Sequence, residues 1–465
     1  MKKKILVTAM LAGLGAASTS QAVFVSPEGT GQVLLFPYYT VQNGFNTSIH
    51  VVNTTNQAKA VKVRILEGKN SQEVLDFNLY LSPYDVWAGA IDHTENGALI
   101  RSVDTSCIAP RQLGAAGEPF RNLRFVNDAD SGNPDRLREG YVEIIEMGVL
   151  TNPDQIAAVT HGPALGDAPL NCGLIRTADF NQTVDVDPPT GGLFGSGHLI
   201  AVQQGLRTSY DAVALDAWSA IPVWTPSASL LPTLADVFPS VGDIIVGNDA
   251  IEFVAQPGRA IDAVSAVLTQ AAIANEYTID AARDSKTDWV ITFPTKRFYV
   301  NPEDRVDTSP FQNSWNSTTL EACHEIIFEY FDREEQSLVP GAGDFSPTPI
   351  TPGFNLCKEV NTLTLYRSSE SAEDARLFGA ESTFNALAIE DFETGWMDLE
   401  FAVSATGSYG VLFGDNDVDV IGLPVIGFSA MSNVVPPEIS GLPDGVLSSF
   451  LGSTSHKGAK VVLTS

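Results

Sequence analysis

Alternation of apolar and polar residues is the clearest pattern in this chain. Val61, Val63 and Ile65 are separated by Lys62 and Arg64. A second run has apolar residues at every other position: Leu75, Phe77, Leu79 and Leu81. Because successive side chains of a strand point to opposite faces, both runs predict strands with one buried face and one polar face.

Similar short segments continue to the C-terminal end, separated by turn-forming Asn, Gly, Asp and Pro residues. The predicted strands cover residues 141–146, 198–204, 288–300, 324–331, 361–366, 396–403, 421–429 and 459–464. We therefore predict a mainly β protein with an antiparallel, immunoglobulin-like β-sandwich core, long insertions and at least one α-helix. This architecture carries many functions and implies none of them.

One segment has the helical period instead. Ile261, Val264, Leu268 and Ala271 are spaced along one face of a helix in an alanine-rich stretch. This spacing predicts a helix over residues 257–277.

The predicted organisation has four parts. Residues 1–22 form a signal peptide, and residues 23–100 supply the first part of the sandwich. Residues 101–284 form an elaborated insertion region that contains the helix, and residues 285–465 add further strands. The last part either completes the first sandwich or forms a second β domain.

The first 22 residues have the features of a bacterial secretory signal. Three lysines precede an apolar run from Ile5 to Ala17, and Ser20 and Ala22 are the small residues of a cleavage site. The run is too short to span a bilayer, and no later stretch predicts a transmembrane helix. We therefore expect an exported protein of the periplasm, the cell surface or the extracellular space.

Four cysteines follow the leader: Cys107, Cys172, Cys323 and Cys357. An even number of cysteines in an oxidising compartment predicts two disulfides. We favour sequential pairing, 107 with 172 and 323 with 357, because it closes the shortest loops. A zinc site is disfavoured because no Cys-x-x-Cys spacing exists.

The chain is strongly acidic. Its net charge is −29, and removal of the three leader lysines lowers this to −32. Such a surface repels phosphate groups, which excludes nucleic acid as a partner. Two interpretations remain: the acids keep the protein soluble, or some of them bind divalent cations.

Calcium is the only cofactor that the acids suggest. Asp415, Asp417 and Asp419 form the best candidate site, because Ca²⁺ takes six to eight oxygen ligands from a loop. A second loop, residues 128–139, has acids at positions 1, 3 and 12 of a calcium loop but lacks the residues expected at positions 5 and 6. Solvated turns are the simpler interpretation of both clusters.

No pattern of catalytic residues is complete, and we assign none. His324 and Glu325 begin like the zinc motif HExxH, but the second His is absent and the segment has the period of a strand that starts at an exposed His. Glycosidase carboxylates are defined by their separation in space, which the sequence does not show. Five acids lie near aromatic residues, as in many sugar sites: Asp85, Asp92, Asp288, Glu325 and Glu329.

Several segments resemble a family of uncharacterised secreted, surface-type proteins of Gram-negative bacteria. They are residues 75–87, 275–277, 287–290 and 293–296. The resemblance extends over most of the mature chain and implies no known activity or site residue.

We favour a secreted, non-catalytic structural or adhesive protein of the cell surface or periplasm. Its partner would be a second copy of itself, joined by β-strand addition through Val23–Val25 or Val461–Leu463. The simpler interpretation is that both end segments pair within their own chain.

Two other classes remain. A secreted carbohydrate-binding or carbohydrate-active protein would recognise a surface polysaccharide through acids and exposed aromatic residues. An outer-membrane β-barrel is the least favoured class, because Pro is frequent and the chain ends in Ser465 rather than an aromatic residue.

Overall fold

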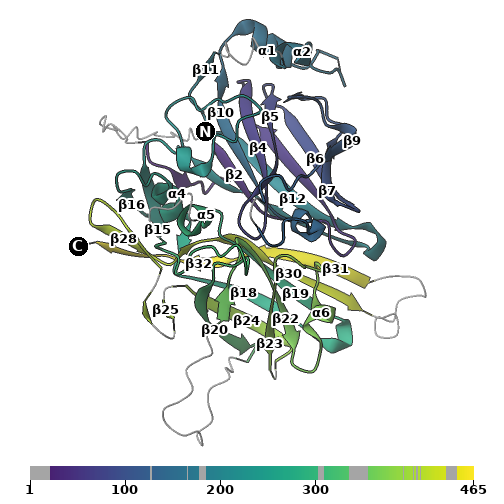
Figure 1. Ribbon diagram of the computed structural model, residues 1–465, viewed down its shortest axis with the longest axis vertical. Helices are drawn as coiled ribbons and strands as arrows, with labels where there is room; N and C mark the ends of the chain where they lie inside the picture. Colours follow the sequence, from purple (N-terminus) through teal and green to yellow (C-terminus); the bar gives the residue numbers. More distant parts are fainter. Residues whose placement is uncertain are drawn as a thin grey trace, which may run out of the picture.

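The computed structural model describes residues 21–125, 128–164, 166–176, 185–301, 308–334, 354–390, 392–401, 403–404, 407–408, 410–435 and 448–464. Residues 1–20 of the predicted signal peptide lie outside this part of the chain. The protein is mainly β, with antiparallel sheets, sandwich-like packing and few helices, as predicted (Figure 1). The immunoglobulin-like topology stays a prediction.

Strands from the first half of the chain form two sheets. The first sheet has the order β1 (Phe24–Val25), β14 (Val213–Asp216), β2 (Val33–Thr40), β10 (Glu139–Leu150), β4 (Lys59–Glu67), β5 (Glu73–Leu81) and β8 (Cys107–Ala109), with β11 (Val186–Asp187) beside β10. The second sheet has the order β13 (Leu206–Asp211), β12 (Leu193–Ala201), β3 (Asn46–Asn53), β6 (Val86–Thr94), β7 (Gly97–Ser102) and β9 (Gly114–Pro119).

Strands from the second half form two more sheets, in the lower part of Figure 1. The third sheet has the order β21 (Phe354–Leu356), β20 (His324–Asp332), β24 (Thr394–Glu400), β18 (Ala272–Thr278) and β32 (Lys457–Ala459). The fourth sheet has the order β23 (Phe384–Ile389), β22 (Val360–Arg367), β19 (Lys286–Thr292), β30 (Ile426–Val435) and β31 (Ser448–Ser455). Its pair β22–β23 is parallel.

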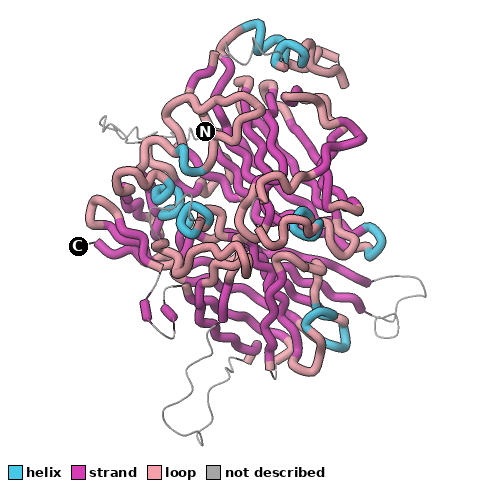
Figure 2. The backbone as a smooth tube through the Cα atoms, in the orientation of Figure 1, coloured by secondary structure: helices cyan, strands magenta, loops and turns pink. Residues whose placement is uncertain are grey.

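Smaller elements surround these sheets, and the helices among them are short (Figure 2). The α-helices are α1 (Pro153–Val159), α2 (Cys172–Ile175), α4 (Ile261–Leu268), α5 (Arg297–Val300) and α6 (Ala372–Ala375), and the 3-10 helices are η1 (Pro134–Leu137), η2 (Val202–Gln204), η3 (Leu234–Asp236) and η4 (Ala281–Arg283). The short strands are β15 (Val241–Val246), β16 (Asp249–Val254), β17 (Thr269–Gln270), β25 (Val403–Ser404), β26 (Gly407–Ser408), β27 (Val411–Phe413), β28 (Val418–Ile421), β29 (Leu423–Pro424) and β33 (Val461–Thr464). None of the described helices is both long and apolar enough to cross a bilayer.

The first and second sheets pack face to face, as the alternating pattern predicts. Val63 and Ile65 of β4 share one core with Ile49 and Trp87 of the second sheet. The other face of β4 differs from the prediction, because every residue of the strand is buried.

The polar face of β4 is stabilised by buried ion pairs. Lys59 Nζ lies 2.6 Å from a carboxylate oxygen of Glu146, and neither side chain is exposed. Arg64 pairs with Glu73 and Glu143 in the same way. A buried charge is tolerated when it is paired and hydrogen-bonded, so alternation here marks two buried faces of different polarity.

The fourth sheet is covered on both faces. Trp289 and Ile291 of β19 belong to the core shared with the third sheet. Val290 of β19 and Phe428 of β30 belong to the core of the first half, where the Phe428 ring stacks on Tyr210 with centroids 4.9 Å apart. The fourth sheet is therefore the layer that joins the two halves.

The buried carboxylate of Glu139 connects the two halves at this junction through hydrogen bonds. Its Oε1 accepts hydrogen bonds from the Tyr38 hydroxyl at 2.8 Å and the Thr383 hydroxyl at 3.0 Å. Its Oε2 accepts bonds from the backbone N–H groups of Glu381 and Ser382 and from the Ser382 hydroxyl, at 2.9–3.0 Å. One side chain of β10 thus fixes the segment that precedes β23.

The predicted helix over residues 257–277 is too long. Helix α4 covers only Ile261–Leu268, because Gly258 has a left-handed φ of +81° before it and the chain turns extended at Thr269. From Ile273 onwards the buried positions alternate, and residues 272–278 form β18, paired with β24. Helix propensity is a weak preference, and here the pairing of β18 with β24 overrides it.

Two other predictions need correction. Residues 101–284 are not an insertion, since they supply β10 and β12 to the interior of the first and second sheets. The strand predicted over residues 288–300 ends at Thr292, and residues 297–300 form α5. Pro294 lies between the two elements and lacks the N–H that a ladder needs.

The two disulfides join the predicted partners. Cys107 of β8 bonds to Cys172 of α2, and Cys323 bonds to Cys357. Both terminal segments pair within their own chain, which is the simpler of the two interpretations: β1 with β14 and β33 with β28.

Glu139→Ala is expected to destabilise the protein by about 3 kcal/mol or more, because several buried donors lose their acceptor at once. The measurement is the free energy of unfolding from urea denaturation. Glu393→Ala, at an exposed position, is the control and should change that free energy by less than about 0.5 kcal/mol. Equal stabilities of the two variants would contradict the role of Glu139.

Glu359 lies buried beside Lys296 and Arg297 at the same junction. Burial raises the pKa of Glu359 to about 8, although both cations favour the charged form. The folded protein therefore holds a proton that the unfolded chain releases above about pH 4.5. Stability from this group is present at low pH and is lost as the pH rises towards about 8.

Glu359→Gln removes this titration while keeping the shape of the neutral side chain. The free energy of unfolding of the variant, relative to the parent, should rise between pH 5 and pH 8. Urea denaturation at both pH values measures it. Parallel pH profiles of variant and parent would show that the carboxyl group does not titrate in this way.

Candidate functional site

The outward face of the third sheet carries an unusual set of side chains. In β24 the inward residues Met397 and Leu399 are buried, so Trp396, Asp398 and Glu400 point outward. Strand register places neighbours beside them: Phe331 and Glu276 flank Trp396, Glu329 lies opposite Asp398, and Ile327 lies opposite Glu400. We call the set Glu276, Glu329, Phe331, Trp396, Asp398 and Glu400 the aromatic–acid face.

The indole of Trp396 forms an exposed, flat platform. It stacks on Phe331 with ring centroids 4.4 Å apart and an angle of 13° between the planes. Its exposed fraction is 42%, whereas Trp87 and Trp289 are completely buried. Because a stacked pair is held in one orientation, this platform is preformed for a planar or ring-shaped ligand.

Four carboxylates surround the platform, from Glu276, Glu329, Asp398 and Glu400. Within the described part of the chain, none of them forms an ion pair with Lys or Arg. Partial burial raises the pKa of Asp398, and the negative charges of Glu400 and Glu329 raise it further. The face therefore offers uncompensated hydrogen-bond acceptors around an apolar ring.

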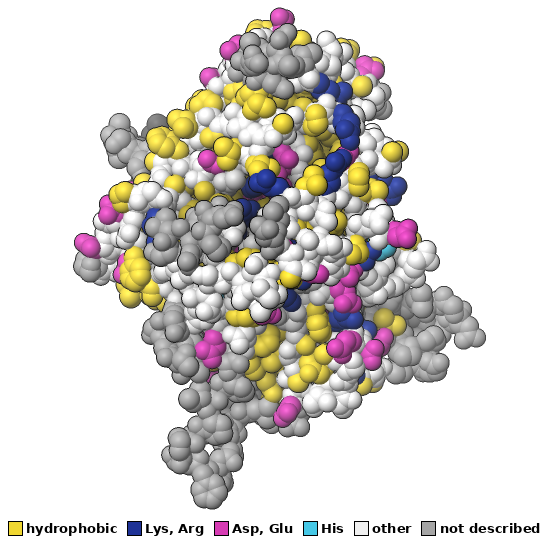
Figure 3. All heavy atoms as spheres, in the orientation of Figure 1, with side chains coloured by type: hydrophobic (Ala, Val, Ile, Leu, Met, Phe, Trp, Pro, Cys, Tyr) yellow, Lys and Arg dark blue, Asp and Glu magenta, His cyan; other side chains and the backbone are white. Residues whose placement is uncertain are grey.

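Figure 3 shows hydrophobic side chains at the surface in the lower part of the molecule, with acidic side chains near them. Exposed apolar groups rimmed by polar ones mark interaction sites in many proteins.

Of the five acids that the sequence singled out, Glu325 and Glu329 lie on the outward side of β20. The other three are engaged elsewhere. Asp85 accepts a bond from the Ser82 N–H at 2.9 Å, and Asp92 pairs with Arg101 at 2.6 Å. Asp288 is buried in the fourth sheet, where it accepts bonds from Thr364 and Phe378.

Sequence analysis missed Trp396 and Asp398 as site residues. The signal was present, because Trp396 occupies the polar phase of an alternating strand in which Met397 and Leu399 occupy the apolar phase. A large aromatic residue in the polar phase is expected to be exposed.

Asp415 and Asp417 of the predicted calcium cluster lie in the turn between β27 and β28, and Asp419 lies in β28. Asn416 anchors this turn to β16, since its side chain bonds to the backbone of Val254 and Glu252. Asp415, Asp417 and Asp419 are not among the described groups whose ligand atoms lie within 4.8 Å of one another. Calcium binding there stays a prediction.

The loop over residues 128–139 serves another purpose. Asp128 pairs with Arg136 at 2.6 Å, and Asp130 pairs with Lys69 at 2.7 Å. Glu139 points instead into the junction between the halves. The acids of this loop therefore neutralise cations of the protein.

Two further sequence features carry no metal site. Glu321, Cys323 and Cys357 are the one converging group in the described chain, but both sulfurs belong to a disulfide. His324 begins a strand as predicted, yet its side chain is buried rather than exposed, and burial lowers its pKa to about 4.

Comparisons with protein-family models, curated proteins and solved structures gave no significant match.

Asp398→Asn is expected to stabilise the protein by about 0.2–1 kcal/mol at pH 7, because like charges opposite each other on a sheet repel. The raised pKa of Asp398 means that its ionisation costs stability as the pH rises, so the gain should vanish below about pH 3.5. Thermal unfolding at pH 3.5 and pH 7 measures both. A gain of equal size at both pH values would contradict the electrostatic origin.

Proposed function

We propose that this is an exported, non-catalytic adhesive protein that binds a polysaccharide through the aromatic–acid face. The observation that supports this proposal most directly is the exposed Trp396, which stacks on Phe331 and is flanked by carboxylates on an open sheet. The two disulfides are compatible with an oxidising compartment.

The chemistry of the face matches a sugar ring. The apolar side of a pyranose consists of C–H groups, which pack on the flat face of an indole. Its hydroxyl groups point outward from the ring edge and donate hydrogen bonds to carboxylates. An ionised carboxylate is an acceptor and has no proton to donate. Glu276 lies opposite Trp396, Glu329 lies diagonal to it and Asp398 lies two positions further along the same strand, and all three provide such acceptors.

Binding is favoured over hydrolysis because the face is open. Glycoside hydrolysis uses two carboxyl groups on either side of a bond that is held in an enclosed cleft. One observation supports hydrolysis as the second candidate: Glu329 and Asp398 lie directly opposite each other, and the pKa of Asp398 is raised. A raised pKa suits a general acid.

The test is retention of the mature protein on a panel of insoluble polysaccharides, with release of reducing sugar measured in parallel. Trp396→Ala should weaken binding to the retained polymer at least about tenfold, because a stacked aromatic contact is lost. Phe413→Ala removes an aromatic residue of similar exposure (51%) elsewhere and is the matched control.

Loss of binding in Trp396→Ala alone, without sugar release, supports the proposal. Sugar release that disappears in Asp398→Asn would replace it with the hydrolase. Equal retention of the parent and Trp396→Ala, or no retention on any polymer, would overturn the role of this face.

A further inference from the structure

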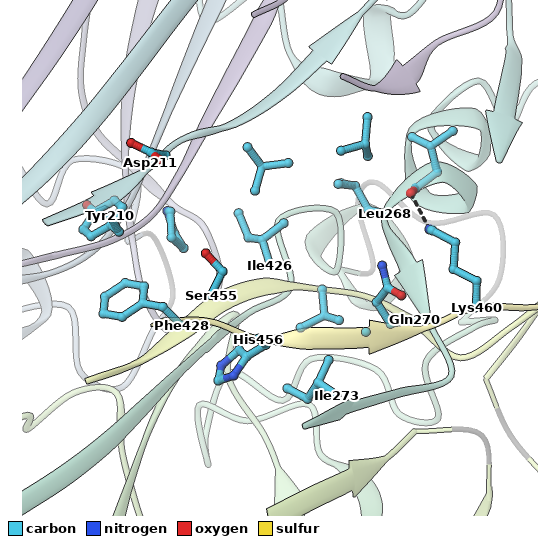
Figure 4. A pocket seen from close by; sticks show the side chains of 17 residues that line it. Tyr210, Asp211, Leu268, Gln270, Ile273, Ile426, Phe428, Ser455, His456 and Lys460 are labelled. Atoms are coloured by element: carbon cyan, nitrogen blue, oxygen red, sulfur yellow. Dashed lines mark hydrogen bonds between the residues drawn. The ribbon is translucent and has the colours of Figure 1, made fainter. Parts of the chain in front are cut away.

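A cavity lies between the two halves, away from the aromatic–acid face. It has a volume of about 200 Å³ and is bounded by the end of α4, by β14 and by the segments around β18 and β30. Its walls are mainly apolar: Val213, Val267, Leu268, Ile273, Val425 and Ile426. Figure 4 shows Leu268, Ile273 and Ile426 around the cavity, with Lys460 at one end and Tyr210 and Asp211 at the other.

The polar groups at the Lys460 end are few. Lys460 Nζ donates to the backbone oxygens of Val267 and Thr269, at 2.8 and 3.0 Å. An ammonium group has three donors, so one remains. No carboxylate of the described chain pairs with Lys460, and burial lowers the pKa of this amine to about 8. The side chain of Gln270 lines the cavity beside it.

Two other polar side chains of the wall, His456 and Tyr210, are already engaged. His456 interacts through Nε2 with the Val290 oxygen at 2.9 Å and through Nδ1 with Asn275 at 3.1 Å. Tyr210 donates its hydroxyl proton to the backbone oxygen of Tyr38. Lys460 is therefore the charged group that is left for a ligand at its end of the cavity.

We propose that this cavity binds a short linear carboxylate with a chain of roughly six to eight carbons. The carboxylate accepts hydrogen bonds from Lys460 and Gln270, and the chain packs against the apolar wall. The volume agrees with this size, because an apolar cavity of about 150 Å³ holds one benzene molecule. The charge of Lys460 gives the sign of the head group, and the Asp211 end disfavours a second carboxylate.

The first experiment uses the unchanged mature protein and calorimetric titration with butanoate, hexanoate, octanoate and decanoate. Affinity should rise about fourfold for each added methylene and then fall once the chain exceeds the cavity. Hexanol is the control for the head group and should bind at least about tenfold more weakly than hexanoate.

The second experiment tests the residue. Lys460→Gln should weaken hexanoate binding about tenfold or more, whereas Lys457→Gln, at an exposed lysine three residues away, should leave it unchanged. Equal affinities for hexanol and hexanoate, or equal losses in both variants, would overturn the carboxylate assignment. Absence of saturable binding by the whole series would show that the cavity is only a packing defect.

Discussion

The fourth sheet is covered by the third sheet on one side and by the N-terminal half on the other. Polar groups on it can therefore be hydrogen-bonded only by other groups of the protein. Asp288 of this sheet meets the requirement by accepting bonds from Thr364 and Phe378, and Glu139 of β10 does the same for the segment that precedes β23. The joining layer thus specifies one alignment of the halves, because any slip would leave buried carboxylates without donors.

Two sets of acids in this chain have opposite surroundings. Inside, Glu146 and Glu143 are matched to Lys59 and Arg64, and each pair supports the polar side of a buried strand. Outside, the carboxylates beside Trp396 have no cation next to them in the described chain. A surface carboxylate without a cation beside it is available to a ligand. For this reason we assign the proposed function to the outward face of the third sheet and not to the buried ion pairs.

Much of the fold follows from the sequence, because a period of two residues is a local signal. The strands around Val63, Phe77 and Trp289 were predictable for this reason, and sequential pairing of the cysteines, which closes the shortest loops, gave the observed disulfides. What lay beyond prediction depends on distant partners. Nothing near Lys62 or Arg64 shows that a second layer will cover them, and nothing near Ile273 shows that β24 will turn a helical pattern into a strand.

The site was harder to predict than the fold for the same reason. Trp396 and Phe331 are 65 positions apart in the sequence, and they form a platform only because β20 and β24 pair in one register. The residues of the cavity are even further apart in the sequence, since its walls come from β14, α4 and the last strands of the chain.

The positions of the last strands have a consequence for how the chain assembles. The chain is synthesised from its N-terminus. All strands of the first two sheets lie before residue 217. The third and fourth sheets need β32 and β31, which come within the last eighteen residues of the chain. Until β30 joins the fold, the face of the Tyr210 ring on which Phe428 stacks stays exposed. The N-terminal half without the second half therefore exposes an apolar surface, as aggregation-prone folding intermediates do.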